Sequence, residues 1–222
     1  IGPGLAKAAI AVSVNGIQQD LCDSINEDSE VSIITTDSDE GLEIMRHTLT
    51  AQVLARAVKN LYPDAKLAIG PTIKDGFYYD FEFVKSITPD DLDKIEKEMQ
   101  KIISSKSAIT KKLHSKKDAL NVFSSIGESY KESIINESGQ EDNFQLYYQE
   151  DNAFVDLCRG PHLPSLKHIG AFKLTKLAGA YWKGDSKNKM LTRIYGTAWK
   201  NEKDLNAYMH SIEEAEKRDH RK

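Results

Sequence analysis

A cysteine and a histidine four positions apart, Cys158 and His162, are the residue types in this chain best suited to chemistry. Such a pair can bind zinc, can act as nucleophile and base, or can simply lie on a turn. The spacing alone favours the turn. A zinc site needs about three or four protein ligands, and a free thiol, whose pKa is about 8.5, is mostly protonated at neutral pH. Either chemistry therefore needs partners from elsewhere in the chain.

Two strands and a helix must position such partners. Strands are predicted at 145–149 and 154–158, so that Cys158 ends a strand. Upstream, apolar residues recur at helical spacing over 42–61. Pro63 ends this helix, because a proline disfavours the helical conformation of the residue before it.

Further strands and helices fill the chain without a repeat or a low-complexity tract. Strands are predicted at 11–14, at Ile17, and at 31–34, 67–71, 76–83, 171–178 and 190–199, and helices at 89–104, 116–124 and 203–217. The Asn15–Gly16 pair after the first strand is the favoured signal of a type I′ hairpin. Antiparallel strands mixed with helices in this order predict an α+β fold.

The composition excludes several classes of protein. The 222 residues carry a formal net charge of −4 with a pI of about 5.9, which does not fit a dedicated nucleic-acid binder. No run approaches the ~18 consecutive apolar residues of a membrane span, so no membrane partner is expected. With only two cysteines, Cys22 and Cys158, and no signal segment, a cytoplasmic protein without disulfides fits best.

Charge is unevenly distributed along the chain. Residues 20–43 contain nine acidic residues and no lysine or arginine, whereas residues 167–203 contain nine basic residues against Asp185 and Glu202 alone. Aromatic residues are interleaved with the second group. This stretch could bind a polyanion, or it could be a solvated cationic face over an ordinary aromatic core.

Several segments resemble the threonyl-tRNA synthetase family of bacterial type. They are Ala68–Pro71 followed by Gly76–Asp80, then Gly127–Lys131, Asp156–His162 and Gly179–Trp199. Each segment is weak alone, but in this order they are highly specific. The resemblance extends over essentially all 222 positions.

The resemblance implies an organisation in three parts. Residues 1–38 would be the remainder of a ubiquitin-like β-grasp (TGS-like) domain without its first strands. Residues 39–202 would be an editing domain of antiparallel sheet plus helices, a fold shared with alanyl-tRNA synthetases. Residues 203–222 would be a helix and linker toward an absent catalytic domain, so we expect an amino-terminal fragment.

The function implied by the resemblance is proofreading. Serine differs from threonine by one methyl group, which a binding pocket discriminates by only ~1–3 kcal/mol, so a second site must hydrolyse the error. The partners would be the 3′ end of tRNA(Thr) carrying serine and the rest of a synthetase chain, as a homodimer. No cofactor is expected in this part; ATP, Mg and Zn would belong to the absent catalytic domain, which ligates threonine to tRNA(Thr).

The resemblance also implies the residues of the site. The catalytic group would be His47, Lys131, Cys158 and His162, and the substrate-binding group Gln52, Gly70, Tyr78 and Asp156. The Lys131 ammonium would hold the aminoacyl ester and its developing negative oxygen, and Asp156 would bind the α-ammonium or the serine hydroxyl. Of two adjacent tyrosines on one strand, Tyr78 is expected to face the cleft.

The chain departs from the family at one position of the site. The family has a His-x3-His pair on the first helix of the editing domain, and here only His47 is present. Either Ala51 replaces the second histidine, or Gln52 occupies its place after one extra residue near His47. We prefer the second alignment, because the distance from Gln52 to Gly70 then agrees with the family.

The missing histidine has two consequences. A metal could be bound only by His47, Cys158 and His162, so no metal site is expected. Water activation would rest on His47, His162, the substrate's ribose hydroxyl or oriented hydrogen bonds. Two alternatives remain, namely a non-catalytic tRNA-binding module and a free-standing alanyl-type editing hydrolase with zinc.

Overall fold

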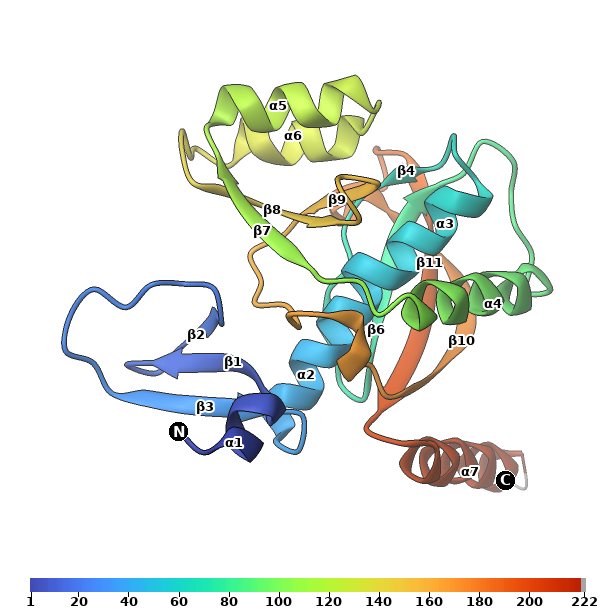
Figure 1. Cartoon of the computed structure of the whole chain (residues 1–222). Helices are drawn as coiled ribbons and strands as arrows, with labels where there is room; N and C mark the ends of the chain where they lie inside the picture. Colours follow the sequence, from blue (N-terminus) through green and yellow to red (C-terminus); the bar gives the residue numbers. More distant parts are fainter. Residues whose placement is uncertain (221–222) are drawn as a thin grey trace.

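Three antiparallel sheets and the helices between them make up residues 1–220, the part of the chain that this computed structural model describes (Figure 1). The predicted α+β fold is confirmed. No helix among these residues is long and apolar enough to cross a membrane.

The first sheet is formed by the amino-terminal residues. Its strands are β1 (Ala9–Val14), β2 (Ile17–Asp20) and β3 (Val31–Thr35), in the order β2-β1-β3. The turn residues Asn15 and Gly16 both have positive φ, as a type I′ hairpin requires. Ile10 and Ile34 pack into the main hydrophobic core, which joins this sheet to the rest of the molecule.

A short helix that the sequence patterns did not predict, α1 (Pro3–Ala8), precedes β1. None of its residues is buried, so it has no amphipathic pattern to detect. The one local signal is Pro3 at the start of the helix, a position that tolerates proline because the missing N–H would be unpaired there anyway.

The central sheet contains five strands. They are β4 (Lys66–Leu67), β5 (Thr72–Ile73), β6 (Gly76–Glu82), β10 (Ala171–Tyr181) and β11 (Met190–Trp199), in the order β10-β11-β6-β4 with β5 paired to β6. Phe77, Tyr79 and Phe81 alternate along β6 and are fully buried. They form the face of the sheet that the helices cover (Figure 1).

One long helix crosses this face in three consecutive parts. They are α2 (Asp39–Thr48), the π-helical turn η1 (Leu49–Leu54) and α3 (Ala55–Leu61). Ser38 caps the start, since its side chain accepts a hydrogen bond from the Gly41 N–H. A π-helical turn accommodates one extra residue within an α-helix, and this turn begins two residues after His47.

The third sheet has the strand order β7-β8-β9. Its strands are β7 (Thr110–His114), β8 (Phe144–Gln149) and β9 (Phe154–Leu157), and α5 (Lys116–Ser125) and α6 (Ser129–Glu137) lie over it (Figure 1). Leu146 and Tyr148 pack in a second hydrophobic core with the helices. Because side chains alternate along a strand, Tyr147 and Gln149 point away from that core, toward the long helix.

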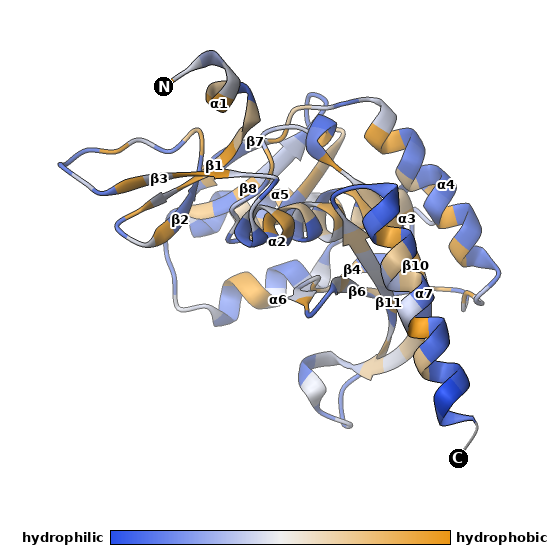
Figure 2. Cartoon of the chain, turned by 90° about the horizontal axis from the view of Figure 1, so that it is seen from below, coloured by the Kyte–Doolittle hydropathy of each residue, from blue (hydrophilic) through white to orange (hydrophobic). Residues whose placement is uncertain are grey.

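Two longer helices complete the fold. The first, α4 (Asp91–Ser104), buries Leu92, Ile95, Met99 and Ile102, and its hydropathy alternates around the axis as expected for an amphipathic helix (Figure 2). The second is α7 (Glu202–Asp219), capped by Asn201. Short 3₁₀ turns occur at η2 (Leu166–His168) and η3 (Trp182–Gly184).

Candidate functional site

A pocket of about 500 Å³ opens where the long helix, the central sheet and the third sheet meet. Its polar lining includes His47, Tyr79, Lys131, Asp156, Cys158 and Arg159, together with Ser138, Gln140, Asn143 and Gln145. Its apolar wall includes Ala51, Ile69, Gly70, Pro71 and Ile134. Residues that are far apart in the sequence therefore contribute to one concave, partly apolar site, which is the usual form of a small-molecule site.

A buried ion pair forms one wall of this pocket. The Nζ atom of Lys131 lies 2.8 Å from Oδ1 of Asp156, and both side chains are almost fully buried. Oδ1 also accepts the Leu157 N–H at 2.8 Å, and Oδ2 accepts the Tyr79 hydroxyl at 3.0 Å. Burial and the nearby carboxylate raise the pKa of Tyr79, so the hydroxyl stays protonated and donates. Protein donors thus occupy most of the acceptor sites of the Asp156 carboxylate. The Lys131 ammonium has three N–H donors, and Asp156 is its one ion-pair partner among residues 1–220.

The start of α6 is fixed by a second buried carboxylate, and this positions Lys131. Oε2 of Glu128 accepts the Leu67 N–H at 2.8 Å, and Oε1 lies 2.9 Å from Nζ of Lys59. These contacts tie α6 to β4 and α3. Glu128 therefore has a structural role: it anchors the helix from which Lys131 reaches the pocket.

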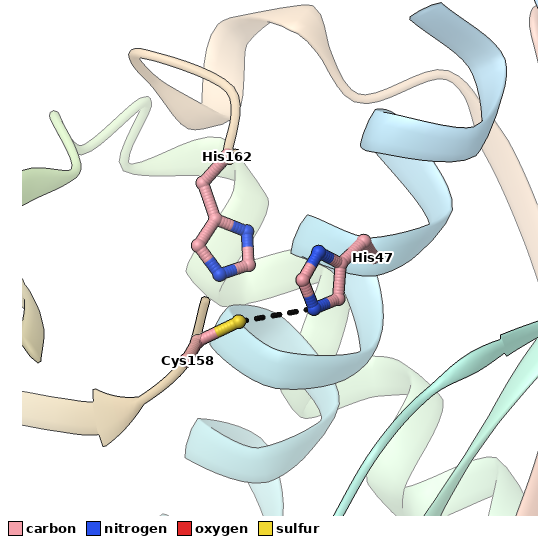
Figure 3. Close-up of side chains that lie close together, drawn as sticks. All are labelled: His47, Cys158 and His162. Atoms are coloured by element: carbon pink, nitrogen blue, oxygen red, sulfur yellow. Dashed lines mark hydrogen bonds between the residues drawn. The ribbon is translucent and has the colours of Figure 1, made fainter. Parts of the chain in front are cut away.

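A thiol and two imidazoles form the opposite part of the site (Figure 3). Sγ of Cys158 lies 3.0 Å from Nε2 of His47, and the rings of His47 and His162 stack with their centroids 4.5 Å apart. Nδ1 of His162 is 2.9 Å from the Thr48 hydroxyl, which comes from the same helix as His47. The hydrogen bond to Thr48 therefore holds the His162 ring next to the ring of His47.

Both imidazoles are neutral at neutral pH. Burial lowers the pKa of His47, although a hydrogen bond with the backbone of Pro161 and nearby carboxylates partly oppose the shift. Burial also lowers the pKa of His162. A neutral imidazole has one nitrogen that can accept a proton, which is the form required of a general base.

The same three side chains are the donors in this pocket that could hold a metal. One atom each from His47, Cys158 and His162 lies within 4.8 Å of the others. However, the 3.0 Å between Sγ and Nε2 is shorter than the roughly 3.5 Å expected for two ligands at about 2.3 and 2.0 Å from one tetrahedral zinc. Ala51 offers no fourth donor. The arrangement fits a hydrogen-bonded cluster better than a zinc site.

Gln52 does not lie in the pocket, and the predicted position is corrected. It is fully buried, and its side-chain and backbone oxygens accept from Nε2 of Gln149 at 2.9 and 2.8 Å. Ala51 lines the pocket instead. Both residues lie on the π-helical turn, where Ala51 faces the pocket with His47 and Gln52 faces Gln149.

The expected cleft residue on β6 is also corrected, since Tyr79 rather than Tyr78 lines the pocket. Tyr78 is on the other face of the sheet, where the Arg193 guanidinium lies 3.8 Å from the centre of its ring. Tyr79 shares its face with Phe77 and Phe81. This alternation of aromatic residues is a sequence signal that could have assigned the faces.

Gly70 lies against Tyr79 so closely that only glycine fits. A Cβ atom at this position would lie 2.1 Å from Cδ2 of the Tyr79 ring. We expect Gly70→Ala to displace the ring and break its hydrogen bond to Asp156, and to cost ~1–3 kcal/mol in the free energy of unfolding, as overpacking does. Urea denaturation and near-ultraviolet circular dichroism measure the two effects.

Gly4→Ala is the matched control for this substitution, because a Cβ there would meet nothing within 4 Å. An unchanged free energy of unfolding and an unchanged aromatic spectrum in Gly70→Ala would show that the close contact with Tyr79 does not hold in solution.

Comparison with known proteins relates both a part of the chain and its whole length to one family. Residues 145–195 match the family model described as "Threonyl and Alanyl tRNA synthetase second additional domain", a stretch that contains Asp156, Cys158 and His162. All 222 residues are 54% identical to a threonine–tRNA ligase of Hahella chejuensis, 51% to that of Acidithiobacillus ferrooxidans and 52% to that of Saccharophagus degradans. The chain spans about a third (34%) of the length of each of these relatives.

Proposed function

Because this chain belongs along its whole length to the threonine–tRNA ligase family, we propose that its pocket hydrolyses the ester of serine wrongly attached to tRNA(Thr). The observation that carries the proposal is the pairing, in one pocket, of a buried ammonium with a neutral imidazole. The first can stabilise negative charge and the second can accept a proton. The longer protein would attach threonine to the same tRNA with ATP.

The proposed reaction uses water as the nucleophile. His47 takes a proton from the water as its oxygen bonds to the ester carbonyl carbon. The carbonyl oxygen becomes negative, and the Lys131 ammonium stabilises it. The imidazolium then returns the proton to the ribose oxygen as the ester bond breaks, which releases serine and the tRNA. Nε2 of His47 is hydrogen-bonded to Cys158 in the structure, so the attacking water would replace Sγ at this nitrogen.

The role of Asp156 follows from its contacts. A carboxylate has about four lone-pair sites, and Lys131, Tyr79 and the Leu157 N–H use three of them. Asp156 therefore holds Lys131 in place, and it can accept at most one further bond from the substrate.

The tRNA would reach the pocket past the basic carboxyl-terminal half. Four lysines of residues 167–203 already pair with acidic side chains, namely Lys173, Lys183, Lys189 and Lys200. Trp199 is partly buried and packs against Tyr208 and under the Arg46 guanidinium. Arg159, which is exposed at the pocket, is the better candidate for a contact to the 3′-terminal phosphates.

A non-catalytic tRNA-binding module is the second candidate function, and Ala51 favours it because it leaves the pocket with one imidazole fewer than the family pattern. Deacylation of seryl-tRNA(Thr) distinguishes the two. A catalytic pocket shortens the lifetime of the ester relative to buffer, whereas a binding module leaves it unchanged or lengthens it.

We expect metal removal to leave the hydrolysis unaffected. After treatment with a chelator, the rate of seryl-tRNA(Thr) deacylation should stay within about twofold of the untreated rate, because the site offers three donors and two of them are already hydrogen-bonded to each other. Elemental analysis of the purified chain provides the control. Near-stoichiometric zinc together with a chelator-sensitive rate would refute this prediction.

A further inference from the structure

A carboxylate from the first sheet lies directly behind the candidate site. Asp20 ends β2 and is buried. Its Oδ1 accepts the backbone N–H of His162 at 2.8 Å, and its Oδ2 accepts the Tyr147 hydroxyl at 2.6 Å. Nζ of Lys111 lies 3.0 Å from the same Oδ2. One side chain of the amino-terminal sheet thus binds three groups of the domain that carries the pocket.

Two of these contacts bear directly on the position of the His162 ring. The Tyr147 ring packs edge-on against the His162 ring, with the centroids 4.5 Å apart and the planes at 87°. Asp20 therefore holds His162 twice, through its backbone and through the aromatic wall against its side chain. The His162 ring also stacks with the His47 ring.

The loop that carries Cys158 and His162 closes over this arrangement. A Cβ atom at Gly160 would lie 2.0 Å from the Tyr147 hydroxyl oxygen. The loop thus runs in contact with the hydroxyl that Asp20 binds. A shift of Asp20 would move Tyr147 and the loop together.

The Lys111 ammonium balances the charge of the Asp20 carboxylate. Lys111, on β7, also pairs with Asp23. Burial lowers the pKa of Lys111, but hydrogen bonds to Asp23 and Asp20 outweigh it and raise the pKa overall, so the ammonium persists. A buried carboxylate with its acceptors filled and its charge paired is held in one geometry.

We propose that Asp20 is a positioning residue of the hydrolytic site, which fixes His162 against His47, so that the amino-terminal sheet completes a site otherwise built from later residues. The inference rests on the proposed hydrolysis of seryl-tRNA(Thr). It assigns to this sheet a contribution to the reaction rather than to binding alone.

The experiment compares Asp20→Ala, Asp20→Asn and Asp23→Asn in the 222-residue chain. Asp23→Asn is the matched control, because Asp23 shares the ion pair with Lys111 and contacts neither His162 nor Tyr147 within the described residues. The amide oxygen of Asn can still accept the Asp20 N–H, which Oδ2 of Asp23 accepts at 3.1 Å. We expect Asp20→Ala to lower kcat between about 10- and 100-fold, the scale of a small misplacement of a catalytic group, with KM within about twofold. Asp20→Asn keeps one acceptor oxygen, so its kcat should fall less than that of Asp20→Ala. Asp23→Asn should keep the wild-type kcat.

Imidazole NMR signals give a readout that does not depend on turnover. The His162 signals should shift in Asp20→Ala and stay in place in Asp23→Asn, while circular dichroism shows that all the variants are folded. Equal loss of kcat in Asp20→Ala and Asp23→Asn, or unchanged kcat and unchanged His162 signals in both Asp20 variants, would overturn the inference. If the wild-type chain itself leaves seryl-tRNA(Thr) intact, the proposed function fails first, and this assignment fails with it.

Discussion

Lys131→Met is expected to lower kcat for seryl-tRNA(Thr) hydrolysis by about 10²–10³-fold, the usual cost of losing a group that stabilises a developing oxyanion. The same substitution leaves the buried Asp156 carboxylate without its counter-charge. Removing one partner of a buried ion pair costs roughly 3–5 kcal/mol, so the free energy of unfolding should fall by that amount. Single-turnover deacylation and urea denaturation measure the two losses.

A second substitution separates the catalytic loss from the stability loss. Adding Asp156→Asn to Lys131→Met removes the unpaired charge while keeping the size of the side chain, so stability should largely recover. The rate should not recover, because the ammonium is still absent. Lys187→Met, at an exposed position, should change neither quantity. Recovery of the rate along with stability would show that Lys131 acts only through the fold.

His47→Ala should lower kcat by about 10²–10⁴-fold, the range typical of losing a positioned general base. The imidazole lines the pocket with Nε2 beside Cys158, and burial keeps it neutral. His210→Ala, on the exposed surface of α7, is the control and should be inert. Full activity in His47→Ala would show that another group, such as the ribose hydroxyl, takes the proton from water.

The same residue sets the expected pH dependence. Because burial lowers the pKa of His47 below the usual 6.5, the basic form persists across neutral pH, and kcat should fall only under more acidic conditions. The effect on stability has the same direction. The unfolded chain binds a proton more readily than the buried imidazole, so the stability contributed by His47 is complete above pH 6.5 and is lost as the pH falls below it. In His47→Ala the acidic decrease of kcat should flatten.

The long helix illustrates what the sequence could and could not predict. Its apolar spacing and Pro63 predicted a helix over 42–61, and the structure has one from Asp39 to Leu61. A π-helical turn, which can absorb one extra residue, begins two residues after His47, and the extra residue inferred there stays a prediction. The direction of Gln52 did not follow, because it depends on where within the turn the backbone absorbs that residue. Packing against Gln149 decides this, and Gln149 is 97 residues away in the sequence.

Two missed elements have a common cause. The edge strand β7, Thr110–His114, is mostly polar and only partly covered, and pairing with β8 makes it a strand. The helix α6 buries only Lys131 and Ile135, so it lacks an apolar period. Periodic patterns of apolar residues reveal a helix or strand that buries one face, and these two elements bury few apolar side chains.

The candidate site, too, could be predicted only in part from the sequence. The resemblance named His47, Lys131, Asp156, Cys158 and His162, and the fold brings all five together, while their roles stay predictions. The contact of Asp20 with His162 spans 142 residues and two sheets. No local pattern carries such a contact, because it exists only once the first sheet docks on the rest of the chain.

The most direct test of the central claim compares the deacylation of seryl-tRNA(Thr) and threonyl-tRNA(Thr) by the 222-residue chain, with Lys131→Met and His47→Ala alongside. The account predicts that the wild-type chain hydrolyses the seryl ester well above the rate in buffer and spares the threonyl ester, and that both variants lose this activity. Seryl and threonyl esters that both decay at the buffer rate with the folded wild-type chain would contradict it.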